Sequence, residues 1–330
     1  MKTVSNLIAC LALSLSVYSQ TYMDFKPKHL VNVVIAQNEG IPIFTYSQFK
    51  IEDYQKVVEA FNFLKNSSKI QFNYPQDNCH NRAEIMSMFL KKKNISHFKI
   101  WNFAPSKMTF FSSQMLEVPD KNNFSPTGKI HWGFHVAPTV LAKVNGKLDT
   151  LVLDPSLFDK PITYRKWLLV QNCKASYYTF LNSEYYLFYS INGSFVHDYE
   201  DYDQNCTTDN DIQLPNYLPK VMTGDFYMYS GSRVTQQWVE KGMAINDMAY
   251  QFYTSELLPI INDPSKAELV KEYKILFGSV NNVESIYLEY PSKCKLDPDL
   301  LEKHKAILDK YREIFIRQTS KWVQIVQELH

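Results

Sequence analysis

The spacing of the apolar residues changes twice along the chain, and these changes constrain the fold more than any other feature. Residues 51–68 carry apolar side chains at i, i+3, i+4 and i+7, which is the spacing of an amphipathic helix, and a second helix with one apolar face is predicted from about Cys79 to Lys93. Residues 98–189 instead hold short β-branched, aromatic or alternating runs, which are typical of strands. Beyond Pro215 the helical spacing returns in three segments, at residues 232–258, 264–277 and 297–329. The sequence therefore predicts an α+β fold with a C-terminal helical extension.

Turn and cap signals mark where several elements begin and end. Asn145-Gly146 separates two strand-like runs and predicts a hairpin turn of type I′, so we expect the two strands to be antiparallel neighbours. Asp263-Pro264 and Asp297-Pro298 are expected helix starts, with Asp as the cap and Pro in the first turn. The patterns divide the chain into a leader at 1–19, an N-terminal segment at 20–48, an α+β domain at 49–212 and a helical extension at 213–330.

The first twenty residues have the pattern of an export signal. Lys2 supplies a positive start, and the apolar run at residues 7–17 is too short to cross a bilayer as a helix. Small or modest side chains before Gln20 predict cleavage there. A lipoprotein-like box ends at Cys10, but few apolar residues precede this cysteine and many follow it, so we do not expect a lipid anchor. The protein is expected to be secreted or periplasmic.

The charges of the chain are balanced, with 35 Lys and Arg residues against 34 Asp and Glu residues. No basic field exists to attract nucleic acid, so nucleic acid is not an expected partner. The sequence has no CxxC, no HExxH and no glycine-rich phosphate loop, and its 8 histidines show no metal-ligand spacing. No metal site and no nucleotide cofactor are therefore predicted.

The mature chain would keep four cysteines in a compartment that permits disulfides: Cys79, Cys173, Cys206 and Cys294. If Cys79 is a nucleophile it must stay unpaired, which leaves one pair and one spare thiol. Cys173 and Cys206 flank the same predicted sheet region, so we expect them to be the pair. The spacing alone leaves the other pairings open.

Cys79 follows a turn-rich stretch and begins a predicted helix that ends near Lys93. A thiol at this position faces unpaired backbone N–H groups and the positive end of the helix dipole, and both lower its pKa toward the thiolate. The same N–H groups can bind an oxyanion formed when the thiolate attacks a carbonyl, and Asp77 is a candidate helix cap. On position alone, however, a structural thiol or one half of a disulfide is the commoner interpretation.

His135 lies in a strand-like run, and Asp154 ends the next run before Pro155. Taken singly, each is more often a packing histidine or a turn aspartate than a catalytic residue. Across the predicted hairpin, however, His135 lies ten residues before the turn and Asp154 eight after it, so the carboxylate can hold the imidazole in one tautomer. His131 shares the run and the expected strand face with His135, so the periodicity does not choose between the two histidines. A nucleophile on a helix start, a base on a strand and a carboxylate on the adjacent strand form the papain-like and transglutaminase-like arrangement.

At these residues the sequence resembles the bacterial protein-glutaminases, which are also called protein-glutamine deamidases. The resemblance covers roughly residues 50–210 and weakens from Gly193 to Cys206. The matching positions are residues 72–79 with Arg82, Ala83 and Met86, then Trp132 with residues 134–137, and then residues 154–158 with Pro161, Thr163 and Trp167.

This resemblance implies an α+β core related to transglutaminases and thiol proteases, with an antiparallel sheet. It implies that Cys79 is the nucleophile, His135 rather than His131 is the base, and Asp154 orients the base. The implied reaction hydrolyses the side-chain amide of protein-bound glutamine to glutamate and ammonia through a thioester. No metal or organic cofactor is implied, and the partners are protein or peptide substrates.

Three alternatives keep the same triad or the same fold: a transglutaminase, a thiol protease and a non-catalytic binding protein. The chain also departs from the family in two ways. Only residues 20–48 stand where the family has a long inhibitory pro-region, and the extension at 213–330 has no counterpart in it. The extension could bind a partner or substrate, cover the active site or stabilise the core.

Overall fold

The computed structural model describes residues 46–108, 112–122, 124–125, 127–190, 225–229, 233–278, 280–287 and 296–330. The leader at 1–19 and the expected domain boundary near 212–220 lie outside these ranges, so the export signal and the division into domains stay predictions. The described part combines helices with a mainly antiparallel sheet, which confirms the predicted mixed fold class at this level.

Six strands form the largest sheet: β1 (Ile51–Glu52), β2 (Phe98–Phe103), β5 (Phe134–Val144), β6 (Lys147–Val152), β7 (Ile162–Thr163) and β8 (Tyr177–Asn182). Their order is β7-β6-β5-β2-β8, and β1 pairs with β5 beyond the end of β2. The β1–β5 pair is parallel, whereas the other pairs in this sheet are antiparallel. β5 is buried from His135 to Ala142, so both of its faces are covered there.

The predicted hairpin at Asn145-Gly146 connects β5 to β6. Val144 pairs with Lys147, so only two residues form the turn. Their φ angles are 51° and 78°, and a type I′ turn requires positive φ at both positions. The hairpin brings the strand that carries His135 beside the chain segment that leads into Asp154.

The run from His131 to Lys143, which the sequence predicts as one strand, consists of two strands that meet at Gly133. The Gly133 carbonyl accepts a hydrogen bond of 2.8 Å from the N–H of Ala104, and the chain changes its pairing partner at this point. The first part is β4 (Lys129–Trp132), which pairs with β3 (Leu116–Pro119) in a separate two-stranded sheet. A third sheet consists of β9 (Tyr185–Ser190) and β10 (Asp225–Tyr229).

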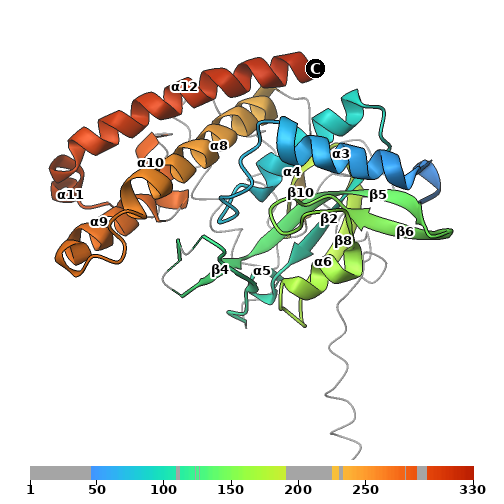
Figure 1. Ribbon diagram of the computed structural model, residues 1–330, viewed down its shortest axis with the longest axis horizontal. Coiled ribbons are helices and arrows are strands. Elements are labelled where there is room, and N and C mark those ends of the chain that lie inside the picture. Colours follow the sequence, from blue (N-terminus) through green and yellow to red (C-terminus); the bar gives the residue numbers. More distant parts are fainter. Residues whose placement is uncertain are drawn as a thin grey trace, which may run out of the picture.

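Helices α3 (Tyr54–Ser67) and α4 (Cys79–Lys92) confirm the two helices predicted before the sheet, and both pack against β5. The side chain of Asp53 caps α3 by accepting a hydrogen bond of 3.1 Å from the N–H of Lys56. α4 is buried over most of its surface because it lies between the sheet and the C-terminal helices (Figure 1). The apolar face predicted for α3 is buried at Val57, Phe61 and Leu64.

The sequence predicts a wholly helical extension, but the strand β10 lies within it, because Asp225–Tyr229 pairs with β9. The rest of its described part is helical, and its longest helices lie side by side (Figure 1). The side chains of Asp263 and Asp297 cap their helices as expected. Buried residues of this extension and of the sheet domain belong to one continuous hydrophobic core. No helix in the described ranges is long and apolar enough to cross a bilayer.

The helical elements of the extension are α8 (Arg233–Phe252), η5 (Tyr253–Leu257), η6 (Pro264–Lys266), α9 (Ala267–Phe277), α10 (Val280–Tyr287), α11 (Pro298–Lys303) and α12 (Lys305–Leu329). The remaining helical elements are η2 (Tyr46–Gln48), α5 (Pro105–Met108) and α6 (Tyr164–Val170).

Gly242 allows α8 to approach the first turn of α4 closely. A methyl group at Gly242 would lie 2.0 Å from the Nδ2 of Asn81. Asn81 is held in place, since its Nδ2 donates to the Oδ1 of Asn78 at 2.8 Å and its Oδ1 accepts from the hydroxyl of Tyr186 at 2.5 Å. The absence of a side chain at Gly242 therefore preserves a buried hydrogen-bond network at the start of α4.

We expect Gly242→Ala to lower the free energy of unfolding by about 1–3 kcal/mol, because the added methyl group must displace Asn81 in a packed core. Urea denaturation followed by circular dichroism measures this change. Lys241→Ala, at the neighbouring half-buried position, is the control and should unfold as the wild type does. An unchanged midpoint for Gly242→Ala would contradict the close approach of α8 to α4.

Candidate active site

Cys79 is the first residue of α4, as the sequence predicts, and is only 6% exposed. The N-cap residue is Asn78 rather than Asp77, and its backbone adopts the left-handed conformation with φ of 61°. Asp77 instead accepts a hydrogen bond of 2.5 Å from the N–H of Asn78 through its Oδ1. The left-handed residue turns the chain sharply from the preceding loop into the helix, and this turn places the thiol at the helix start.

The thiol of Cys79 lies against the beginning of β5. Its Sγ is 4.0 Å from the carbonyl oxygen of Phe134, and the backbone of Val136 also forms a polar contact with it. These two residues flank His135 in the chain. The packing of α4 on β5 therefore brings the thiol to the segment that carries the imidazole.

Burial determines the ionisation of Cys79 in this structure. It raises the pKa of the thiol to about 12, although the nearby positive charge of Arg82 acts in the opposite direction. The sequence predicts a lowered pKa from the helix start, and that expectation is wrong in this structure because desolvation outweighs the influences that lower the pKa, Arg82 first and the backbone of Val136 second. The resting group is a neutral thiol, so its reaction requires a base that removes the proton.

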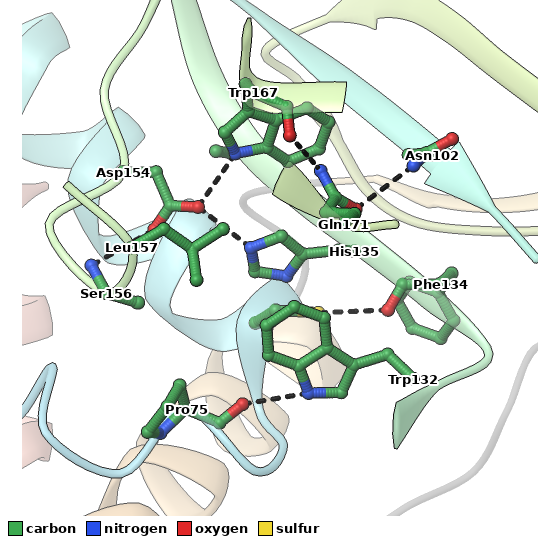
Figure 2. A network of polar contacts seen from close by, with 12 residues as sticks. Pro75, Asn102, Trp132, Phe134, His135, Asp154, Ser156, Leu157, Trp167 and Gln171 are labelled. Carbon is green, nitrogen blue, oxygen red and sulfur yellow. Dashed lines mark hydrogen bonds and ion pairs between the residues drawn. The ribbon is translucent and has the colours of Figure 1, made fainter. Parts of the chain in front are cut away.

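His135 and Asp154 lie together in the buried interior, with exposures of 1% and 2%. The Nε2 of His135 is 2.8 Å from the Oδ2 of Asp154 (Figure 2). The carboxylate also accepts hydrogen bonds from the Nε1 of Trp167 at 2.8 Å and from the N–H of Ser156 at 3.1 Å. Burial opposes ionisation of Asp154, but the interactions with His135 and Trp167 outweigh it and lower the pKa of the carboxyl group.

The two nitrogens of the His135 ring have different surroundings. Nε2 contacts the carboxylate, whereas Nδ1 is buried and has no hydrogen-bond partner within the described ranges. A carboxylate that accepts from Nε2–H holds the neutral ring in the tautomer whose Nδ1 carries a free lone pair. This nitrogen can accept a proton. The predicted pair of His135 and Asp154 is therefore formed, with the acceptor nitrogen unoccupied.

Part of this chain matches a known protein family. Residues 57–171 match the glutaminase family. The matched segment contains Cys79, His135 and Asp154, and it ends before the C-terminal helices. The match confirms the resemblance predicted from the sequence for this segment. A comparison with curated proteins gives no match.

Solved protein-glutaminase structures are also similar to this chain. The crystal structure of a pro-protein-glutaminase is 25% identical over 42% of this chain and 50% of its own, with a TM-score of 0.33. A crystal structure of protein-glutaminase is 19% identical over 60% of this chain and 87% of its own, with a TM-score of 0.38. The NMR structure of protein-glutaminase from Chryseobacterium proteolyticum is 19% identical over 62% and 89%, also with a TM-score of 0.38. The chain thus spans half the length of the pro-protein-glutaminase that it matches.

Two tryptophans of the matched segment, Trp132 and Trp167, enclose the imidazole. The ring of His135 stacks on the indole of Trp132 at 4.3 Å between centroids and on that of Trp167 at 5.3 Å. Both indoles are anchored by their Nε1, Trp132 to the carbonyl oxygen of Pro75 at 2.9 Å and Trp167 to Asp154 (Figure 2). The sequence places both residues in the family pattern but predicts no role for them. Their stacking restricts rotation of the ring.

Two buried amide side chains, those of Gln171 and Asn102, support Trp167. The Nε2 of Gln171 donates to the carbonyl oxygen of Trp167 at 2.9 Å, and its Oε1 accepts from the Nδ2 of Asn102 at 3.0 Å (Figure 2). Asn102 is the residue of β2 that pairs with His135. Sequence reasoning missed Gln171 and Asn102, because a lone amide residue in a helix or strand carries no signal until its neighbours are known.

His131 is separated from this site. It lies on β4, its side chain is 44% exposed, and its Nε2 is 3.3 Å from the Oε2 of Glu117. The expectation that His131 and His135 share a strand face is wrong, because the chain bends at Gly133 between them. The geometry therefore favours His135, in agreement with the family resemblance.

Cys173 is buried and is a free thiol in this structure, as is Cys79. The disulfide expected between Cys173 and Cys206 stays a prediction, because Cys206 lies outside the described residues, as does Cys294. Within the described ranges, no three His, Cys, Asp or Glu side chains are grouped so that they could bind a metal ion.

Proposed function

We propose that this chain is a cysteine-dependent hydrolase that converts protein-bound glutamine to glutamate and ammonia. The observation that carries the proposal is the buried pair of His135 and Asp154, with the Nδ1 of His135 unoccupied and the thiol of Cys79 against the same segment of β5. The match of residues 57–171 to the glutaminase family supports the choice of a side-chain amide as the substrate. The papain-like and transglutaminase-like order of groups, with the nucleophile on a helix start, belongs to the same proposal.

In the first half of the reaction, the Nδ1 of His135 takes the proton of the Cys79 thiol as the sulfur attacks the carbonyl carbon of the glutamine amide. The oxyanion that forms lies near the backbone N–H groups at the start of α4, which are unpaired at a helix start. His135 then gives its proton to the departing nitrogen. The C–N bond breaks, ammonia leaves and a thioester to Cys79 remains.

In the second half, His135 removes a proton from water, and the resulting hydroxide attacks the thioester carbon. The C–S bond breaks, glutamate leaves and the sulfur takes the proton back from His135. Asp154 stays ionised throughout and stabilises the imidazolium that forms in each half. The balance is one glutamine and one water consumed for one glutamate and one ammonia released.

Ammonia release from a glutamine-containing protein, followed with and without an added primary amine, tests this function. We expect release in both cases, together with the mass gain that marks conversion of an amide to an acid. Incorporation of the amine in place of that conversion would indicate a transglutaminase, and cleavage of the peptide backbone without ammonia would indicate a thiol protease. A wild-type chain that acts on no glutamine substrate would overturn the proposal and leave a binding protein.

We also propose that the chain is exported and that the mature protein begins at Gln20. The positive residue and short apolar run of the leader support this, and such a leader is removed by a signal peptidase. N-terminal sequencing of the protein from its producing cells tests it. A chain that starts at Met1 in the cytoplasm would contradict export.

A further inference from the structure

A buried arginine lies one helical turn after Cys79. Arg82 is 1% exposed, and residues three apart in a helix are neighbours on its surface. Its Nη1 donates to the carbonyl oxygen of Tyr74 at 3.1 Å and to the Oδ1 of Asn246 at 2.8 Å. Among the described residues, its buried Nη2 has no hydrogen-bond partner and no carboxylate forms an ion pair with this guanidinium. Both of its anchors are therefore neutral oxygens.

Burying a charge without an ion-pair partner costs free energy, so the groups around Arg82 indicate what its charge does in the protein. After the lowering effect of burial, the largest influence on the pKa of the Arg82 guanidinium is the charge of Cys79 when it is a thiolate, which raises that pKa, and the next is the charge of Asp154. Conversely, Arg82 is the largest influence that lowers the pKa of the Cys79 thiol against the effect of burial. The positive charge thus acts on the groups of the proposed reaction.

The residue that holds this charge comes from the C-terminal extension. Asn246 of α8 is fully buried and lies 164 positions from Arg82 along the chain. Its Oδ1 accepts from Arg82, and its Nδ2 donates to the carbonyl oxygen of Gln71 at 2.9 Å. Because both ends of the amide are engaged, its orientation is determined. α8 also reaches the first turn of α4 at Gly242, one helical turn before Asn246.

We propose that Asn246 is a positioning residue of the active site, which holds the guanidinium of Arg82 beside Cys79 so that the positive charge favours the thiolate and the anionic intermediate. An amide suits this role because it anchors the guanidinium without neutralising it, whereas a carboxylate would pair with it and cancel its charge. The inference deepens the proposed function and rests on it. It makes α8 part of the catalytic unit.

Asn246→Asp is the sharpest test, because the new carboxylate keeps the size of the side chain and neutralises Arg82. The rate at which iodoacetamide alkylates Cys79 in the full chain is measured against pH, with peptide mapping to separate Cys79 from the other cysteines. We expect the thiol to ionise about one pH unit higher, so that alkylation is about tenfold slower at each pH. The kcat for ammonia release should fall by a similar factor with little change in KM.

Asp247→Asn is the matched control at the next position of α8. Asp247 accepts from the Nζ of Lys321 at 2.7 Å and from the Nε1 of Trp322 at 2.8 Å, so it holds α8 to α12 and not to Arg82. We expect this variant to unfold at lower urea concentration and to keep the wild-type alkylation rate. If Asn246→Asp does not fold, Asn246→Ala removes the anchor and is judged by the same measurements, with the same direction expected.

The inference would be overturned if the folded Asn246 variant kept the alkylation rate and the kcat of the wild type. It would also be overturned if Asp247→Asn slowed alkylation by the same factor as the Asn246 variant. Alkylation needs no glutamine, so it separates this inference from the function on which it rests. If the wild type released no ammonia from any substrate, the proposed deamidation would fail. The alkylation rates would still decide whether Asn246 and Arg82 act on Cys79.

Discussion

Replacing Cys79 with serine is expected to reduce ammonia release by at least about 10⁴-fold, because loss of the nucleophile removes the covalent step. The hydroxyl fits the buried space of the thiol at the start of α4, so the fold should be retained. A hydroxyl is a much weaker nucleophile than a thiol when it must be deprotonated by the same imidazole. The measurement is kcat for ammonia release from a glutamine peptide, with circular dichroism to establish that the variant is folded.

Cys173→Ser is the control for this substitution. Cys173 is the other described cysteine; it is also buried, and it packs in a separate small cluster with Trp132 and residues of β3 and β4. We expect the control to keep the wild-type kcat. Substantial activity in folded Cys79→Ser would remove the thiol from the mechanism, and equal losses in both variants would indicate a general effect of losing a buried sulfur.

Replacing Asp154 with asparagine is expected to lower kcat by about 10³–10⁴-fold while preserving the shape of the site. The neutral amide no longer stabilises an imidazolium. If its NH₂ group faces His135, it donates to Nε2 and drives the ring into the tautomer whose Nδ1 carries the proton. That nitrogen could then not accept a proton from Cys79. Steady-state kinetics measure the loss, and NMR of the imidazole nitrogens reports the tautomer.

Asp159→Asn is the matched control for Asp154→Asn. Asp159 lies five residues later, its side chain is 92% exposed, and it forms a surface ion pair of 2.5 Å with Lys65. Exposed pairs of this kind contribute about 1 kcal/mol or less, so we expect no measurable change in kcat. An Asp154→Asn enzyme with the kinetics of the control would contradict the orienting role of the carboxylate.

Local signals in the sequence predict the elements that carry the candidate site. Asn145-Gly146 specifies the hairpin between β5 and β6, since few residues other than Asn and Gly tolerate the positive φ of a type I′ turn. The turn before Cys79 and the apolar spacing after it predict α4. Together these two elements bring the thiol, the imidazole and the carboxylate to one place, and their catalytic roles stay predictions.

Other features depend on neighbours that are distant in the chain. Gly133 divides an apparently continuous strand because its carbonyl oxygen accepts a hydrogen bond from the N–H of Ala104. The spacing of apolar residues in the sequence does not predict that contact. Asn246 occupies the apolar face of α8, seven residues after Val239, and this polar residue on a buried face is a signal in the sequence. The signal indicates a buried partner without identifying it as Arg82.

Turns, caps and helix starts depend on neighbouring residues, so the sequence alone predicts the candidate residues of the site and the local elements that present them. The ionisation of those residues depends on the tertiary structure. The thiol of Cys79 lies at a helix start, a position that lowers a thiol pKa, yet packing of α4 between β5 and α8 buries it and raises the pKa. Desolvation and the charge of Arg82 both change the pKa of Cys79 by amounts that depend on the surrounding atoms. Those atoms come from segments that only the folded chain brings together.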